Sequence, residues 1–290
     1  MKKKISVILF GLLFLVGFGI LIYPTVSNQW NTYRQSQLIS NYQSVVQDMT
    51  PEDFTQEWER AEAFNATITQ NNLYSDVFGE STTDLQSTEY WKILNEAGDG
   101  IMGYLSIPKI NIKLAIYHGT ADDVLQTGVG HLNGTKLPIG GESTHCVVAA
   151  HRGLPSAKLF TDIDQLRNGD KFYIHVLDQV LAYEVDQILV VEPEDTAALA
   201  VEEGEDLVTL LTCTPYGVNT QRLLVRGHRV DYVADEVAAE QTPLSGISLH
   251  TNYLLWVIVG ILITGVFILI LFIREKRFRK RPAREKETEE

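Results

Sequence analysis

Two long uncharged apolar segments, one near each end, constrain this chain more than any other feature. They are ISVILFGLLFLVGFGILIY at residues 5–23 and YLLWVIVGILITGVFILILFI at residues 253–273. A helix needs about 20 consecutive apolar residues to cross a bilayer. The sequence therefore predicts two transmembrane helices, with most of the chain between them.

The first segment also has a second interpretation. Three lysines at positions 2–4 would suit the basic start of a secretory signal peptide. However, the apolar run is longer than that of a usual signal peptide, and no clear small-x-small cleavage site follows it. We therefore expect an uncleaved anchor at residues 5–23. The second segment, residues 253–273, has no such ambiguity.

The charges beside the two segments predict an orientation. Residues 2–4 are lysines, and eight further Lys and Arg residues lie in the tail at 274–290. The positive-inside rule places residues 1–4 and 274–290 in the cytoplasm. Residues 24–252 are then outside the cell, with 32 acidic and 13 basic side chains and a formal charge of −19. That charge excludes nucleic acid as a partner bound by charge alone, and it attracts basic groups such as a lysine amine.

The chain has two cysteines, Cys146 and Cys213, and both lie in apolar runs typical of strands. Nothing in the sequence brings them together, and an exported domain with so few cysteines is not a disulfide scaffold. We expect both to be free thiols. His131 and His145 have no cysteine or carboxylate at a spacing typical of zinc sites, so no metal or other cofactor is expected.

Residues 24–72 have the three- and four-residue apolar spacing of helices. Thr50-Pro51-Glu52-Asp53 is typical of a helix start, with threonine as the cap and proline in the first turn. We expect a helical hairpin leading from the membrane, and a simple spacer remains the alternative. Residues 73–99 have no sustained period, which indicates a loop region.

Residues 100–233 change to the alternating pattern of strands, and residues 234–252 form a polar linker to the second apolar segment. Short helical pieces such as Ala157–Leu166 fit between the strands. These observations alone favour a mainly β domain, either a barrel or a sandwich. The strands are predicted at 103–119 (a pair), 144–150, 171–177, 181–192, 206–213 and 221–233.

Three residues have positions that would suit a cysteine nucleophile and the two groups that assist it. Cys213 ends an apolar strand, His151 follows another, and Arg222 begins the strand after Cys213. A reactive cysteine needs a base or a lowered pKa, and a developing oxyanion needs a hydrogen-bond donor. From spacing alone, however, a buried structural cysteine is the simpler interpretation.

Longer stretches support the catalytic interpretation. TLLTCTPYGVNTQRLLVRGHR (209–229) resembles the active-site signature of the sortases, which are cysteine transpeptidases of Gram-positive cell surfaces. VVAAHRGLPSAKLFTDIDQL (147–166) and VGHLNGTKLPIGG (129–141) also resemble sortase segments. Together the matches cover essentially all of residues 100–233, in the family's order.

The resemblance implies a fold, a reaction and site residues. The fold would be a closed β-barrel of about eight strands with short helices. Cys213 would be the nucleophile, His151 the general acid and base, and Arg222 the group that stabilises the oxyanion and the substrate. The reaction would cleave a Leu-Pro-x-Thr-Gly-like sorting signal after threonine, hold it as a thioester and pass it to an amine.

Two features resemble the class C, pilus-assembling sortases in particular. One is the second apolar segment with its basic tail. The other is Asp76-Val77-Phe78, which resembles the family's Asp-Pro-aromatic lid with valine in place of proline. In that class the aspartate pairs with the catalytic arginine, and the aromatic ring covers the cysteine. Without the proline, the backbone of this segment is less constrained.

Three functions therefore remain open from the sequence. The first is a two-pass, membrane-anchored sortase that joins pilin subunits, with a lysine amine of the next subunit as the acceptor. The second is a sortase that anchors surface proteins to the cell-wall precursor. The third is an inactive barrel used for adhesion or scaffolding, and the intact set of Cys213, His151 and Arg222 argues against it.

Overall fold

The computed structural model describes residues 2–68, 78, 86–233, 260 and 265. The chain divides into two units, residues 1–241 and 242–290. The predicted linker at 234–252 and cytoplasmic tail at 274–290 lie outside the described residues. So does the predicted second transmembrane helix at 253–273, apart from Gly260 and Gly265.

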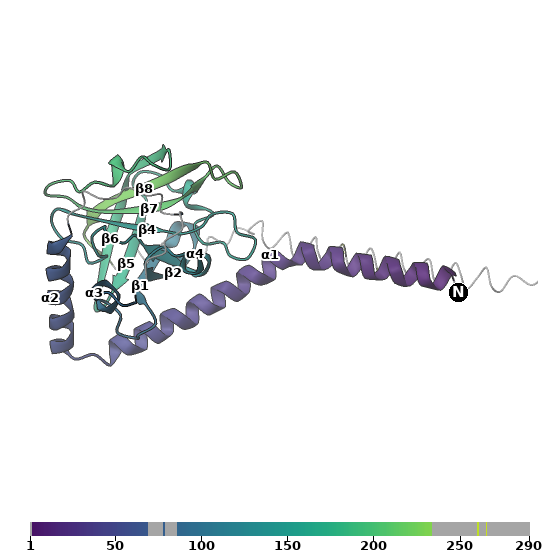
Figure 1. Ribbon diagram of the computed structural model, residues 1–290, viewed down its shortest axis with the longest axis horizontal. Coiled ribbons are helices and arrows are strands. Elements are labelled where there is room, and N and C mark those ends of the chain that lie inside the picture. Colours follow the sequence, from purple (N-terminus) through teal and green to yellow (C-terminus); the bar gives the residue numbers. More distant parts are fainter. Residues whose placement is uncertain (1, 69–77, 79–85, 234–259, 261–264, 266–290) are drawn as a thin grey trace, which may run out of the picture. The chain divides into compact units, whose positions relative to one another are not determined.

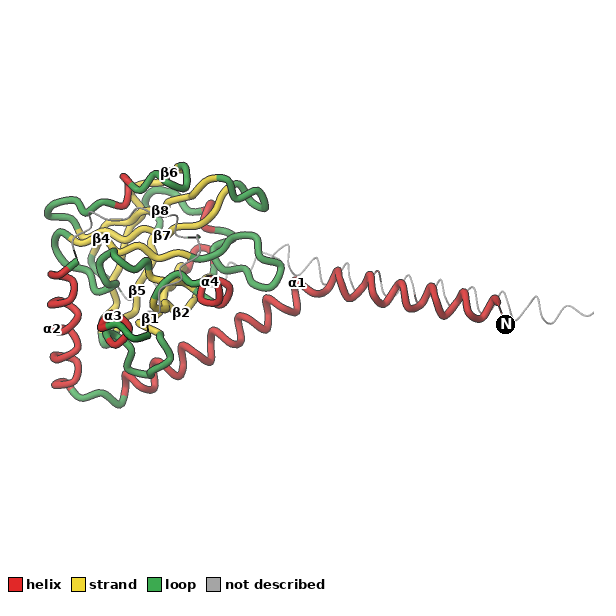
Figure 2. The backbone as a smooth tube through the Cα atoms, viewed as in Figure 1, coloured by secondary structure: helices red, strands yellow, loops and turns green. Residues whose placement is uncertain are grey.

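Eight strands of the first unit form a closed barrel in the order β1-β2-β3-β4-β7-β8-β6-β5 (Figures 1 and 2). Most neighbours are antiparallel, while β2 pairs with β3 and β4 pairs with β7 in parallel. Closure by β1 and β5 distinguishes a barrel from a sandwich, the two alternatives that the strand pattern left open. The strands are β1 Ile101–Ile107, β2 Ile112–His118, β3 Val129–His131, β4 Thr144–Ala149, β5 Lys171–Val176, β6 Gln179–Val191, β7 Asp206–Thr214 and β8 Gln221–Val230.

The strands β4, β7 and β8 carry apolar residues on both faces. One face, with residues such as Val148 and Leu210, packs in the main core of the barrel. The other face, with Ala149, Leu211 and Leu224, belongs to a second apolar cluster outside the barrel. A strand buried on both faces shows a continuous apolar run rather than alternation, as in LVTLL before Thr212.

Helices and 3₁₀ turns surround the barrel (Figure 2). The predicted helix start at Thr50 is present: its hydroxyl accepts from the N–H of Asp53 at 3.3 Å, and the Asp53 carboxylate accepts from the N–H of Thr50 at 2.8 Å. The helices are α1 Lys2–Gln47, α2 Pro51–Thr67, α3 Glu89–Lys92 and α4 Asp122–Thr127, and the 3₁₀ turns are η1 Pro108–Ile110, η2 Ile163–Gln165 and η3 Ala197–Leu199.

Helix α1 joins the first apolar segment to the barrel without a break. Among the described residues, Gly11–Gln47 is the one helix that is long and apolar enough, by length and composition, to cross a membrane. Its C-terminal half lies along β1 and β2 (Figure 1), where Ile39 and Tyr42 pack against Tyr104 and Ala115. The helical hairpin is therefore part of the barrel's packing rather than a simple spacer.

The structure differs from the sequence prediction in three places. Ala157–Leu166 is not a helix, because only Ile163–Gln165 forms a 3₁₀ turn and Leu159 has a φ of +38°. Strand β3 was not predicted as a separate strand, since three residues are too few to show a period. Residues 89–92, in the predicted loop region, form the short helix α3, in which the Thr88 hydroxyl accepts from the N–H of Trp91.

Candidate active site

Cys213 and Arg222 lie opposite each other on neighbouring strands. Strands β7 and β8 are antiparallel, and their register pairs Cys213 directly with Arg222. Each residue is 7% exposed. One guanidinium nitrogen of Arg222, Nη1, donates to the carbonyl oxygens of Asn219 at 3.1 Å and Gln221 at 3.0 Å. These bonds hold the guanidinium at the strand end that carries the cysteine.

His151 reaches the same end of the barrel through the parallel pairing of β4 with β7. The register pairs Ala149 with Leu211, and continuing it by two residues along each strand puts His151 level with Cys213. The alignment continues past the end of β4, because the N–H of Ala150 donates to the Leu211 carbonyl at 3.2 Å. The buried hydroxyl of Thr212 also donates to the Ala150 carbonyl at 2.7 Å. Thr212 thus holds the strand exit just before the histidine.

The imidazole of His151 is partly open to solvent, with 23% of its side chain exposed. Its Nε2 lies 3.4 Å from a carboxylate oxygen of Asp122, at the start of α4. The other oxygen of Asp122 accepts from the Gln126 amide at 2.5 Å. An imidazole with this exposure can be reached by a substrate, as a general acid and base must be.

Phe78 lies between the histidine and the arginine. Its ring centroid is 5.4 Å from that of His151, and the guanidinium carbon of Arg222 is 5.2 Å from the same centroid. The latter distance is typical of a cation–π contact. The aromatic residue of the predicted lid is therefore in contact with two of the three predicted site residues. Asp76 and Val77 lie outside the described residues.

Phe78 also rests on an apolar surface that the sequence analysis did not identify. This surface is the outer face of β4, β7 and β8, extended by residues of β6 and by Leu199 of η3. The buried members of this cluster are each at most 3% exposed, so the cluster is covered in this structure. The continuous apolar runs of β4 and β7 indicated burial on both faces. The sequence pattern did not show which residues cover the outer face, because that depends on the topology.

Cys146 has a very different environment from Cys213. It is 2% exposed, lies on β4 and faces the main core. Burial in this apolar setting raises the pKa of its thiol far above the usual range. Cys146 is therefore a neutral thiol at physiological pH, and it has no reactive role.

The buried histidines are also structural. His131 is fully buried, with Nδ1 2.8 Å from the Tyr90 hydroxyl and Nε2 2.8 Å from the Lys136 carbonyl oxygen. Burial lowers the pKa of His131 to about 4, so the ring is neutral at pH 7. A neutral ring satisfies both contacts if Nε2 donates and Nδ1 accepts. Within the described part of the chain, no group of three or more His, Cys, Asp and Glu side chains could hold a metal ion.

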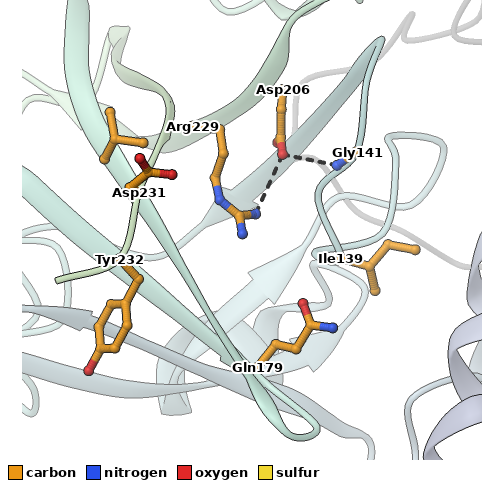
Figure 3. A pocket seen from close by; sticks show the side chains of 8 residues that line it. Ile139, Gly141, Gln179, Asp206, Arg229, Asp231 and Tyr232 are labelled. Carbon is orange, nitrogen blue, oxygen red and sulfur yellow. Dashed lines mark hydrogen bonds and ion pairs between the residues drawn. The ribbon is translucent and has the colours of Figure 1, made fainter. Parts of the chain in front are cut away.

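A pocket lies at the end of β7 and β8 that is opposite to Cys213 and Arg222 (Figure 3). Asp206 begins β7 there, whereas Cys213 is next to its end. The Asp206 carboxylate accepts from the N–H of Gly141 and the hydroxyl of Tyr183, each at 2.9 Å, and lies 3.5 Å from Arg229. The fold itself thus provides partners for this carboxylate, at the end of β7 away from Cys213.

Comparison with known proteins gives a consistent family. Residues 105–230 match the family model described as the sortase domain. The crystal structure of sortase C-1 from Streptococcus pneumoniae is 46% identical, covering 68% of this chain and 100% of that one, with a TM-score of 0.64. The pilus-related sortase C of Group B Streptococcus is 41% identical, covering 67% of this chain and 97% of that one, with a TM-score of 0.62.

Curated relatives match over a shorter region. Sortase D of Bacillus subtilis is 30% identical over 131 residues, which are 44% of this chain and 63% of that protein. For the first three curated relatives, the chain spans between 60% and 63% of their length. The family-model match at residues 105–230 includes all three predicted site residues, Cys213, His151 and Arg222.

Proposed function

The chain belongs to the sortase family, and on this basis we propose that it is a membrane-anchored, class C-like sortase that joins pilin subunits covalently. The observation that carries the proposal is the meeting of Cys213, His151 and Arg222 at one end of the barrel, next to the aromatic ring of Phe78. Identity of 41–46% to sortase C structures, over nearly the whole of those chains, supports class C.

The first half of the proposed reaction forms a thioester. The thiolate of Cys213 attacks the threonine carbonyl carbon of an LPxTG-like sorting signal, and the carbonyl oxygen becomes an oxyanion. Arg222 stabilises this charge with a charge-assisted hydrogen bond. His151 donates its proton to the departing glycine nitrogen, so the C–N bond breaks and a neutral amine leaves. The threonine acyl group remains on Cys213.

The second half transfers the acyl group. A lysine amine of the next pilin attacks the thioester carbon, neutral His151 accepts the proton, and the Cys213 thiolate leaves. An amide bond replaces the thioester, and the resting pair is restored. The strongly acidic region at 24–252 supports a cationic acceptor by long-range attraction.

A gel comparison of cell-surface proteins tests this proposal. Covalent pilin polymerisation predicts a ladder of high-mass species that survives denaturation and disappears in Cys213→Ala. Cys146→Ala is the matched control, because it removes the other thiol from the barrel core. We expect the control to keep the ladder as long as the protein folds.

The outcomes separate the alternatives left open by the sequence. A ladder that persists unchanged in Cys213→Ala would rule out the proposed activity. Loss of wall attachment with an intact ladder would instead support the anchoring of surface proteins to the cell-wall precursor.

A further inference from the structure

Arg152 directly follows the proposed general acid and base, and its side chain is almost fully buried. Only 8% of it is exposed. Its guanidinium has three partners: Nε donates to the Thr161 carbonyl at 3.2 Å, Nη1 to the Thr214 hydroxyl at 3.3 Å, and Nη2 pairs with the Asp164 carboxylate. With all three nitrogens engaged by the protein, Arg152 has no role in contacting a substrate oxygen.

The loop after His151 folds back onto its own start through two hydrogen bonds. Phe160 N–H donates to the His151 carbonyl at 3.2 Å, and Gly153 N–H donates to the Thr161 hydroxyl at 3.3 Å. Arg152 reinforces this closure from inside the loop through Thr161 and Asp164. The backbone that carries the imidazole is therefore fixed by its own loop as well as by β4.

The third partner connects this loop to the nucleophile's strand. Thr214 is the residue immediately after Cys213 and the last residue of β7. A second contact lies beside it: a Cβ atom at Gly153 would be 3.2 Å from the ring of Tyr216, and Gly153 has a φ of +81°. The two strand exits that carry His151 and Cys213 thus meet through Arg152 and Gly153.

We propose that Arg152 is a positioning residue that fixes the separation between His151 and Cys213 and thereby keeps the thiol reactive. This inference rests on the proposed function of that pair. Imidazolium stabilises a thiolate only at short range, so a looser loop returns the thiol pKa towards about 8.5. A lysine could keep the positive charge but not the planar fork that binds three partners at once.

The test measures alkylation of Cys213 by iodoacetamide in the full-length protein from pH 5 to 10. Peptide mass spectrometry distinguishes Cys213 from Cys146. We expect Arg152→Met and Arg152→Lys to slow the reaction at pH 7 about three- to tenfold and to move its midpoint to higher pH, since each pKa unit changes the thiolate fraction about tenfold. Thr214→Val, which removes the contact next to Cys213, should move the midpoint in the same direction by less.

Two further variants make the test decisive. Arg226→Met removes another arginine with little exposure, 13% of its side chain, that pairs with two acids, Asp186 and Glu202. This change should lower stability without moving the midpoint. His151→Ala reports on the proposed function itself, because it must move the midpoint if His151 and Cys213 act as a pair.

The inference is overturned if His151→Ala moves the midpoint while a folded Arg152→Met variant does not. It is also overturned if Arg226→Met moves the midpoint as far as Arg152→Met does. Wild-type behaviour of Arg152→Lys or Thr214→Val would also overturn it, because charge or the loop alone would then suffice. An unchanged midpoint in His151→Ala would instead count against the proposed function.

Discussion

Cys146 and Cys213 show how strongly position decides the chemistry of one residue type. They lie on paired strands, β4 and β7, yet Cys146 faces the barrel core while Cys213 sits at a strand exit opposite Arg222. Burial, with a smaller contribution from the charge of Asp206, raises the pKa of the first thiol and keeps it protonated. A neighbouring guanidinium and an aligned histidine give the second the surroundings in which thiolates form.

Phe78 provides the prediction at the scale of single residues. Its ring contacts both His151 and Arg222, and we propose that it limits access to the Cys213 thiol. Phe78→Ala should therefore speed alkylation of Cys213 roughly two- to tenfold, as expected when a thiolate becomes more accessible. The measurement is the rate of modification by a bulky maleimide at pH 7.

Phe64→Ala is the control for Phe78→Ala, because Phe64 packs against Tyr90 from helix α2. Equal rates in the wild type and Phe78→Ala would show that the ring is no barrier. Equal acceleration in both variants would point to general loosening of the barrel rather than to a lid.

At the scale of single residues, the sequence singled out reactive or charged residues that lie at strand ends. Cys213, His151 and Arg222 each stand at the end or start of an apolar run, and the structure brings these strand ends together. Arg152 was not singled out, because an arginine in a loop gives no pattern until its partners are known. Asp122 was missed for the same reason: its contact with His151 spans 29 positions and depends on where α4 lies.

Helix α1 is the element that connects the first apolar segment to the barrel. Gln35 is 1% exposed and makes two bonds across this contact. Its oxygen accepts from the N–H of Ala115 at 2.9 Å, and its nitrogen donates to the carbonyl of Thr127 at 2.7 Å. One polar side chain thus satisfies the backbone of both β2 and α4.

Gln35→Ala should lower the free energy of unfolding of the barrel by about 1–3 kcal/mol, because it removes the partner of the buried Ala115 N–H and of the partly buried Thr127 carbonyl. Gln37→Ala, at an exposed position on the same helix, should change it by less than about 0.5 kcal/mol. Urea unfolding of the detergent-solubilised protein measures both. Equal effects in the two variants would mean that α1 does not depend on Gln35 for its attachment.

The elements that could be predicted were those long enough to show a period. The capped start of α2 and the strands β4 to β8 fall close to their expected positions. Ala157–Leu166 was expected to be helical, but its backbone is held elsewhere: Lys158 N–H donates to the Asn28 side chain at 2.8 Å, and Ser27 donates to the Ser156 carbonyl at 3.0 Å. Such long-range bonds override local helix preference.

At the scale of the whole molecule, the sequence pattern could not choose between a barrel and a sandwich. Closure depends on pairings between distant segments, such as β1 with β5 and β4 with β7. Periodicity shows which residues face a core, but it does not show which strands are neighbours. The resemblance to sortases, rather than the strand pattern, predicted the closed barrel.

The same closure creates the site. Parallel pairing of β4 and β7 puts their ends at one edge of the barrel, and antiparallel pairing of β7 and β8 brings Arg222 back to that edge. Three residues between 9 and 71 positions apart in the chain thereby meet. The pocket around Asp206 and Arg229 at the other ends of these strands is satisfied by the fold itself.

The central claim is that Cys213 carries the threonine acyl group of a sorting signal, and trapping this thioester tests it most directly. The purified protein and its Phe78→Ala variant are incubated with a Leu-Pro-x-Thr-Gly peptide and analysed by mass spectrometry. We expect the peptide fragment up to threonine on Cys213, cleavable by hydroxylamine, absent from Cys213→Ala and transferred on addition of a lysine-containing acceptor. A peptide fragment attached elsewhere, an adduct that persists in Cys213→Ala, or no adduct in either protein would contradict the claim.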